Sequence, residues 1–125
     1  MGRGTYEPAL SAGITSPYAH LRQYVFSRTL AGADPAVEIV SGDPVAFVRE
    51  LKQQDGMDVW LCGGGELAGT LLPEIDALIV KCYPVAIGAG IPVFSTAFRP
   101  HRFGLVDSRS FAGGAAVLTY TRGLD

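Results

Sequence analysis

Few residues of this chain are suited to metal binding or thiol chemistry. Its 125 residues include two cysteines and two histidines, which share no metal-ligand spacing, so we expect no metal site. Cys62 and Cys82 both lie in apolar, strand-like stretches, and the N-terminus lacks the apolar core of a signal peptide. We therefore expect two buried, reduced thiols and a cytoplasmic location.

The sequence also lacks an excess of charge, a long apolar run and a hydrolase motif. Its net charge of −2 at pH 7 gives no electrostatic reason to expect nucleic acid or an anionic membrane as a partner. The longest uncharged stretch, residues 82–98, contains prolines and glycines that argue against a transmembrane helix. No Gly-x-Ser-x-Gly occurs. An apolar share of 48% indicates one globular domain over residues 1–125.

The hydrophobic periodicity predicts an α/β fold. Strands are expected at residues 23–27, 37–40, 59–62, 77–83, 102–111 and 115–122. Helices are expected at residues 2–10, limited by Pro8, at residues 44–54, capped by Asp43, and after the glycines at 63–65, ending at Pro73. Strand and helix alternate in the first half, and strands dominate the second. We therefore expect a mixed sheet flanked by helices, parallel early and antiparallel in a C-terminal hairpin turning at Gly113-Gly114.

A run of three glycines, Gly63 to Gly65, lies between the buried strand expected at 59–62 and the helix that follows. Backbone N–H groups at such a helix start, together with the helix dipole, can bind an anion, and glycine lets a phosphate approach the backbone. The spacing matches neither the dinucleotide fingerprint nor the P-loop. A tight turn that needs a positive φ explains the glycines equally well.

Three separated pieces of the sequence resemble the dihydrofolate reductase superfamily. They are Met1-Gly2-Arg3-Gly4-Thr5-Tyr6-Glu7, Phe26-Ser27-Arg28-Thr29 and Gly63-Gly64-Gly65-Glu66-Leu67, in the order and rough spacing of that superfamily. With the segment from Tyr83 to Phe94, they are most similar to the branch resembling the C-terminal reductase domain of bacterial riboflavin biosynthesis, RibD. The resemblance covers nearly the whole chain. It implies a three-layer dihydrofolate reductase-like α/β fold.

What the resemblance implies for function is binding of NADPH and reduction of a small heterocycle. The cofactor-binding residues it implies are Gly2, Arg3, Thr5, Ser27, Arg28, Thr29, Gly63, Gly64, Gly65, Glu66 and Leu67. Of these, the family's Gly-Arg-x-Thr turn holds cofactor phosphate, and the polar group at 27–29 holds the 2′-phosphate. A guanidinium beside hydroxyls at a strand's carboxyl end suits a phosphate dianion and favours NADPH over NADH.

The sequence departs from the family at its start, where the first strand, a short helix and most of the next strand are absent. We therefore expect a domain incomplete at its N-terminus, whose strand at 59–62 has unpaired backbone groups. Such a chain is poorly stable, or it fills the gap by rearrangement or by pairing with a second copy. Much of the family's substrate site lies in that segment, so the catalytic residues are unknown. Glu66 is explained by capping of the helix N-terminus as readily as by a functional role. Lys81 is expected to be a solvated strand lysine, and Tyr83 is expected to be a core residue.

Two functions follow from these features. The first is an NADPH-dependent oxidoreductase acting on a pterin-like or ribosylamino-pyrimidine-like heterocycle. The alternative is a non-catalytic or truncated nucleotide-binding remnant that acts as a dimeric module. His20 and His101 have no partner at catalytic spacing and are expected at the surface. Homodimers are usual in this branch, and late aromatic residues could form the interface. They are Phe94, Phe98, Phe103 and Phe111.

Overall fold

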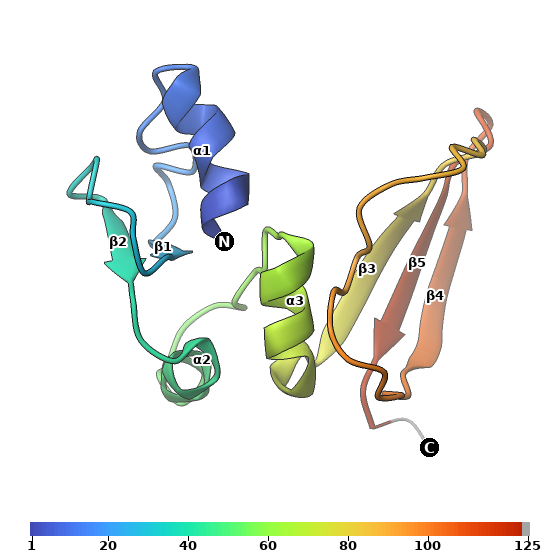
Figure 1. The fold of residues 1–125 in the computed structure, drawn as a ribbon. Helices are drawn as coiled ribbons and strands as arrows, with labels where there is room; N and C mark the ends of the chain where they lie inside the picture. Colours follow the sequence, from blue (N-terminus) through green and yellow to red (C-terminus); the bar gives the residue numbers. More distant parts are fainter. Residues whose placement is uncertain (124–125) are drawn as a thin grey trace. The chain divides into compact units, whose positions relative to one another are not determined.

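The computed structural model describes residues 1–123, and within it the chain forms two compact units (Figure 1). The first comprises Met1–Leu72 and the short segment Pro92–Thr96. The second begins at Pro73–Ile91 and resumes at Ala97. Strand pairing is confined to one unit or the other.

The first unit is built on two parallel strands, β1 (Gln23–Phe26) and β2 (Val37–Val40), paired from Gln23 opposite Val37 to Phe26 opposite Val40. The first two residues of the chain run along the other edge of β1. There the Phe26 N–H donates to the Met1 carbonyl over 2.9 Å, and Gly2 forms a parallel bridge with Phe26. The carboxyl ends of these segments therefore lie side by side.

Three helices accompany these strands: α1 (Arg3–Ser11), α2 (Pro44–Lys52) and α3 (Gly65–Leu71), the last followed by the 3₁₀ turn η1 (Leu72–Glu74). The expected cap of α2 is confirmed, because the Asp43 carboxylate accepts from the Val45 N–H over 3.0 Å. The helix expected at residues 2–10 is confirmed as α1, which has Pro8 inside it and ends at Ser11. Its fully buried Tyr6 packs with Val25.

The strand expected at residues 59–62 is absent, and this prediction was wrong. The segment has no regular structure, and Val59 and Trp60 are exposed. A strand needs a neighbouring backbone to satisfy its N–H and C=O groups. Just after the segment, Gly2 N–H does donate to the Gly63 carbonyl over 2.8 Å, so pairing begins only where the glycines start.

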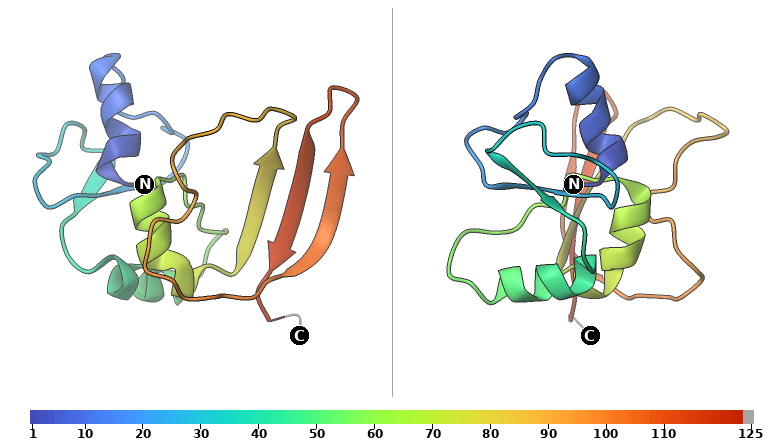
Figure 2. Two further views of the ribbon diagram at one scale, coloured as in Figure 1. Left: turned by 45° about the vertical axis from the view of Figure 1, so that its right-hand side comes forward. Right: turned by 60° about the vertical axis from the view of Figure 1, so that its left-hand side comes forward.

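The second unit is an antiparallel sheet with the order β3-β5-β4 (Figure 2). Its strands are β3 (Ala77–Cys82), β4 (Gly104–Ser110) and β5 (Ala116–Thr121). The hairpin expected at Gly113-Gly114 is confirmed: Gly114 has a φ of 90°, and Phe111 N–H donates to the Ala115 carbonyl over 2.9 Å. The register between β4 and β5 shifts between Leu105 and Asp107.

The expected α/β class is therefore confirmed, with parallel pairing early and antiparallel pairing late, although the strands form two sheets where one was expected. Both cysteines are free thiols, but neither is buried: Cys62 is half-buried and Cys82 is exposed. Cys82 is the last residue of β3, a strand whose residues are all exposed or half-buried. Tyr83, expected in the core, is likewise exposed.

Candidate functional site

The start of α1 lies directly against the glycine run. Besides the hydrogen bond from Gly2 to the Gly63 carbonyl, the Thr5 hydroxyl lies within 3.5 Å of where a Cβ would stand at Gly63 and 3.4 Å of where one would stand at Gly64. A Cβ at Gly2 would in turn lie 3.7 Å from the Gly64 nitrogen. Two segments some sixty residues apart in sequence thus form one surface of bare backbone and a hydroxyl.

Two of the three glycines have structural reasons of their own. Gly63 has a φ of 117°, a conformation that side chains disfavour, and its peptide bond to Gly64 is cis. A Cβ at Gly65 would lie 2.5 Å from the Pro92 carbonyl oxygen. Gly64 has an extended φ of −99°, and a Cβ there would meet only ordinary contacts. Of the three positions, position 64 is therefore the one where the fold gives the least reason for a glycine.

Arg3 joins the start of α1 to the polar turn after β1. Its Nη1 donates to the Thr29 hydroxyl over 3.0 Å, and its Nε lies 3.4 Å from a Glu7 carboxylate oxygen. Within the turn, the Ser27 hydroxyl accepts from the N–H groups of Thr29 and Leu30. All three sequence pieces singled out above therefore come together in the first unit, with α1 between the other two.

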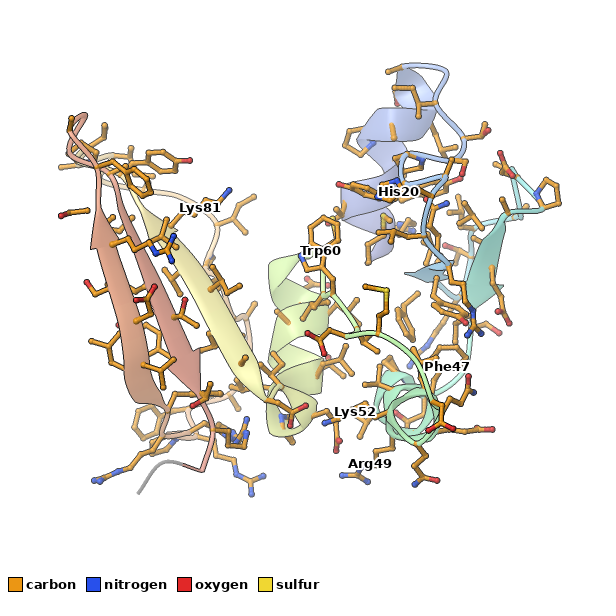
Figure 3. All side chains as sticks on the ribbon, turned by 180° about the vertical axis from the view of Figure 1, so that it is seen from behind. His20, Phe47, Arg49, Lys52, Trp60 and Lys81 are labelled. Carbon is orange, nitrogen blue, oxygen red and sulfur yellow. The ribbon has the colours of Figure 1, made fainter. Side chains whose placement is uncertain are left out.

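The remaining predicted residues are less closely involved. Arg28 is exposed on the same turn, and Glu66 is exposed in the first turn of α3. Leu67 is buried, so its side chain belongs to the core. Lys81 is exposed on β3, in the second unit (Figure 3).

The histidines differ from each other. His20 is exposed, as expected. His101 is half-buried, and its Nδ1 lies 3.4 Å from Arg122 Nη1, a contact that was not predicted from the sequence. The sequence hides this contact because the two residues are far apart along the chain.

Sequence reasoning missed a cluster that borders the glycine run. Tyr18, in the loop expected at residues 11–20, packs edge-on against Trp60, with ring centroids 5.1 Å apart. Its hydroxyl lies 3.4 Å from the Cys62 Sγ, and this hydrogen bond, more than the nearby thiolate charge and burial, raises the pKa of Tyr18. An aromatic residue in an otherwise small and polar loop was the signal that could have indicated the cluster.

Two shallow hollows in the described part of the chain lie elsewhere on the first unit. They are lined by residues of β1, β2, α2 and the neighbouring loops, chiefly Arg22, Tyr24, Glu38, Phe47 and Glu50. None of the predicted cofactor-binding residues lines them. Among residues 1–123, no helix is long and apolar enough to cross a membrane. No cluster of three or more potential metal-binding side chains occurs in that range.

Comparison with known proteins gives consistent matches. The family model described as the RibD C-terminal domain matches residues 8–117. The chain is 33% identical to the uncharacterized protein YwjB of Bacillus subtilis, over 98% of this chain and 71% of that protein. It is 31% identical to the uncharacterized protein YyaP of the same organism, over 79% of this chain and 54% of that protein.

Solved structures agree on the fold. A putative riboflavin biosynthesis protein from Shewanella sp. PV-4 aligns with a TM-score of 0.77 at 25% identity, covering 98% of this chain and 72% of that one. A pyrimidine reductase-like protein from Corynebacterium diphtheriae aligns with a TM-score of 0.58 at 15% identity, covering 89% and 54%. The second likeness concerns the fold alone.

Proposed function

The chain belongs to the RibD C-terminal domain family, and from that premise we propose that it is an NADPH-dependent reductase of a pterin-like or ribosylamino-pyrimidine-like heterocycle. Because the family is reductase-like, oxidoreductase is the enzyme class that we propose for this chain. The cofactor, the substrate and a cytoplasmic location are parts of the proposal. The alternative, a nucleotide-binding module without turnover, is an outcome of the test below.

The observation that carries the proposal is the meeting of three phosphate-compatible segments. Gly2 is hydrogen-bonded to Gly63, Thr5 lies against Gly63 and Gly64, and Arg3 reaches Thr29. A guanidinium, several hydroxyls and bare glycine backbone are the donors that phosphate oxygens accept from. Ligands of α/β sheets generally bind beyond the carboxyl ends of the strands, where Ser27 follows β1, Gly2 forms a bridge with Phe26, and the Gly2 N–H donates to the Gly63 carbonyl.

The residues offer hydrogen-bond donors suited to the phosphate groups of NADPH. Gly2 is the N-cap of α1 and no side chain caps the helix, so the N–H groups of Arg3 and Gly4 suit an anion, whereas the Thr5 N–H already donates to the Gly2 carbonyl over 3.2 Å. Gly64 adds no side-chain atoms of its own beside the Thr5 hydroxyl. When bound, the cofactor supplies the hydride, and the protein's part is to hold and orient it. Arg3 and the start of α1 would bind the pyrophosphate, and Ser27, Arg28 and Thr29 the 2′-phosphate.

The two arginines make the proposal testable by calorimetric titration with NADPH and NADH. Arg3→Gln should weaken both nucleotides about 10- to 100-fold, since a charge-assisted hydrogen bond is lost from a phosphate common to both. Arg28→Gln should weaken NADPH alone, because only NADPH carries the 2′-phosphate. Arg99→Gln removes an exposed arginine of the second unit and should change neither affinity.

The outcomes separate the two functions. Preference for NADPH that disappears in Arg28→Gln supports the assignment. Absence of nucleotide binding by a chain with a cooperative melt contradicts the reductase proposal for this chain. Binding without hydride transfer to any pterin or aminopyrimidine would favour the module without turnover.

We also propose a homodimer formed through the second unit. Phe98 and Phe111 are exposed there, whereas Phe94 and Phe103 are half-buried, and the Arg122 guanidinium lies 4.6 Å from the centroid of the Phe103 ring. Phe98 and Phe111 are thus the members of the expected set available to a partner. Light scattering of the wild type and of Phe111→Lys tests this: a dimer that dissociates in the variant supports the proposal, and a wild-type monomer contradicts it.

A further inference from the structure

Trp60 is the only tryptophan of the chain, and its indole is 60% exposed although it is held in place. The Tyr18 ring meets it edge-on at 5.1 Å with an interplanar angle of 82°. The Tyr18 hydroxyl is fixed at the same time by the Cys62 Sγ, at 3.4 Å. Trp60 and Cys62, two residues apart, therefore share one bracing side chain.

Tyr18 is held in turn by Gln23, the only buried polar side chain among the described residues. Its Oε1 accepts from the Tyr18 N–H over 2.9 Å, and its Nε2 donates to the Ser16 hydroxyl over 2.9 Å. A buried amide with both groups satisfied fixes its partners well. Gln23 thus orders the loop that presents Tyr18 to Trp60. An exposed aromatic ring so supported loses little conformational freedom when a ligand binds it.

The place of Trp60 relates it to the candidate cofactor site. It precedes Gly63 by three residues, and its partner Tyr18 contacts Cys62, the residue directly before Gly63. The neighbouring side chains of the same segment, Val59 and Met57, are also exposed, but neither is a flat ring. Trp60 therefore offers a flat, preorganised surface close in the chain to the glycine backbone.

We propose that Trp60 is a stacking surface for the planar nitrogen heterocycle that this protein reduces, and that Tyr18 is its positioning residue. The inference rests on the proposed reductase function and adds a specificity-determining residue to it. Planar heterocycles stack on indole with little dependence on their substituents, so Trp60 would favour flat bicyclic or pyrimidine rings over aliphatic substrates. Hydrogen bonding to the backbone beside it would orient the ring edge.

The test uses the whole chain, saturated with NADP⁺, and two probes, pterin and 6-aminouracil, titrated calorimetrically. Trp60→Leu should weaken the probe that binds by at least about tenfold, the range of stacking losses on removal of an aromatic ring. Trp60→Phe should retain most of the affinity, because a stacking ring remains. Met57→Leu, at a 96% exposed side chain of the same segment, is the matched control and should change nothing.

The outcomes distinguish this inference from the proposed function. Equal heterocycle affinity in Trp60→Leu and wild type overturns the inference, as does failure of both probes to bind a protein that binds NADP⁺. A wild-type protein that does not bind NADP⁺ would instead contradict the proposed function. Acrylamide quenching of the free protein adds a test independent of substitution: an indole already shielded from acrylamide, by a second copy or another segment, overturns the inference.

Discussion

The two units of this chain contain similar apolar residues, but only the first has a core. All the buried side chains of the described residues belong to it, among them Tyr6, Val25 and Val37. In the second unit, no residue of the three-stranded sheet is buried, and Ile79, in the middle of β3, is 71% exposed. A sheet needs a second layer to bury its apolar face, whereas strands packed by a helix already have one. The comparison shows that strand composition alone does not make a core.

The edges of the second sheet also differ from each other. Edge strand β4 carries a register shift and an Asp107–Arg109 ion pair, with oxygen and nitrogen 3.3 Å apart. Edge strand β3 is apolar apart from Lys81 and continues without a register shift along β5. Charges and bulges protect edges from association, so β4 resembles a protected edge and β3 an accessible one.

The largest expected effect is at the core of the first unit. Tyr6→Ala removes a fully buried ring that packs on Val25 and donates a hydrogen bond to the Thr15 carbonyl, and should lower the free energy of unfolding by about 3–5 kcal/mol. Ile87→Ala, at a 74% exposed side chain of the second unit, should change it by no more than about 0.5 kcal/mol. Urea denaturation measures both. A large loss in Ile87→Ala would mean that the second unit is covered in solution.

The second effect concerns the segment Pro92–Thr96, which belongs to the first unit although it follows β3. A Cβ at Gly69, in α3, would collide with the Ser95 carbonyl oxygen. Gly69→Ala should therefore lower the free energy of unfolding by about 1–3 kcal/mol through overpacking, although alanine has the better helix propensity. A Cβ at Gly4, in α1, would meet nothing within 4 Å, so Gly4→Ala should raise the free energy of unfolding by about 0.5–1 kcal/mol. Equal thermal shifts in both variants would show that the segment does not pack there.

A third effect tests what holds the second unit without a core. Arg122 donates from Nε to the Ile75 carbonyl over 2.8 Å, approaches His101 and stacks on Phe103. A lysine ammonium cannot make these three contacts at once. Arg122→Lys should therefore lower the free energy of unfolding by about 1–2 kcal/mol and speed amide hydrogen exchange at the end of β5. Arg109→Lys is the control at an exposed ion pair and should be nearly neutral. Unchanged exchange in Arg122→Lys would contradict this role.

The smallest effect is the pH dependence of the first unit. The Ala36 N–H, and then the Thr15 hydroxyl, lower the pKa of Asp34 below its ordinary value of 3.8. A lowered folded-state pKa means that the stabilisation is present above 3.8 and is lost as the pH falls through the folded pKa. Asp34→Asn should therefore be less stable than wild type well above that pH, with the difference shrinking below it. A difference that does not depend on pH would refute this assignment.

Much of the local structure could be predicted from the sequence because the signals were local. Asp43 before Pro44 determined the start of α2, and Gly113-Gly114 the final hairpin. The proposed cofactor segments were recognised from short motifs, and the tertiary structure brings them together. The strand at 59–62 was mispredicted because apolar composition does not provide a pairing partner. The poor stability expected from its unpaired backbone stays a prediction, as do the site residues.

The sequence by itself determined the helices, the strands with local turn signals and the family, since these depend on residues near one another in the chain. Only the tertiary structure decided that Arg3 reaches Thr29, that Arg122 holds His101, and that Gln23 orders the loop bearing Tyr18. These contacts join residues whose separation along the chain carries no periodic signal. Burial was decided in the same way, because whether an apolar strand is covered depends on which layer packs against it.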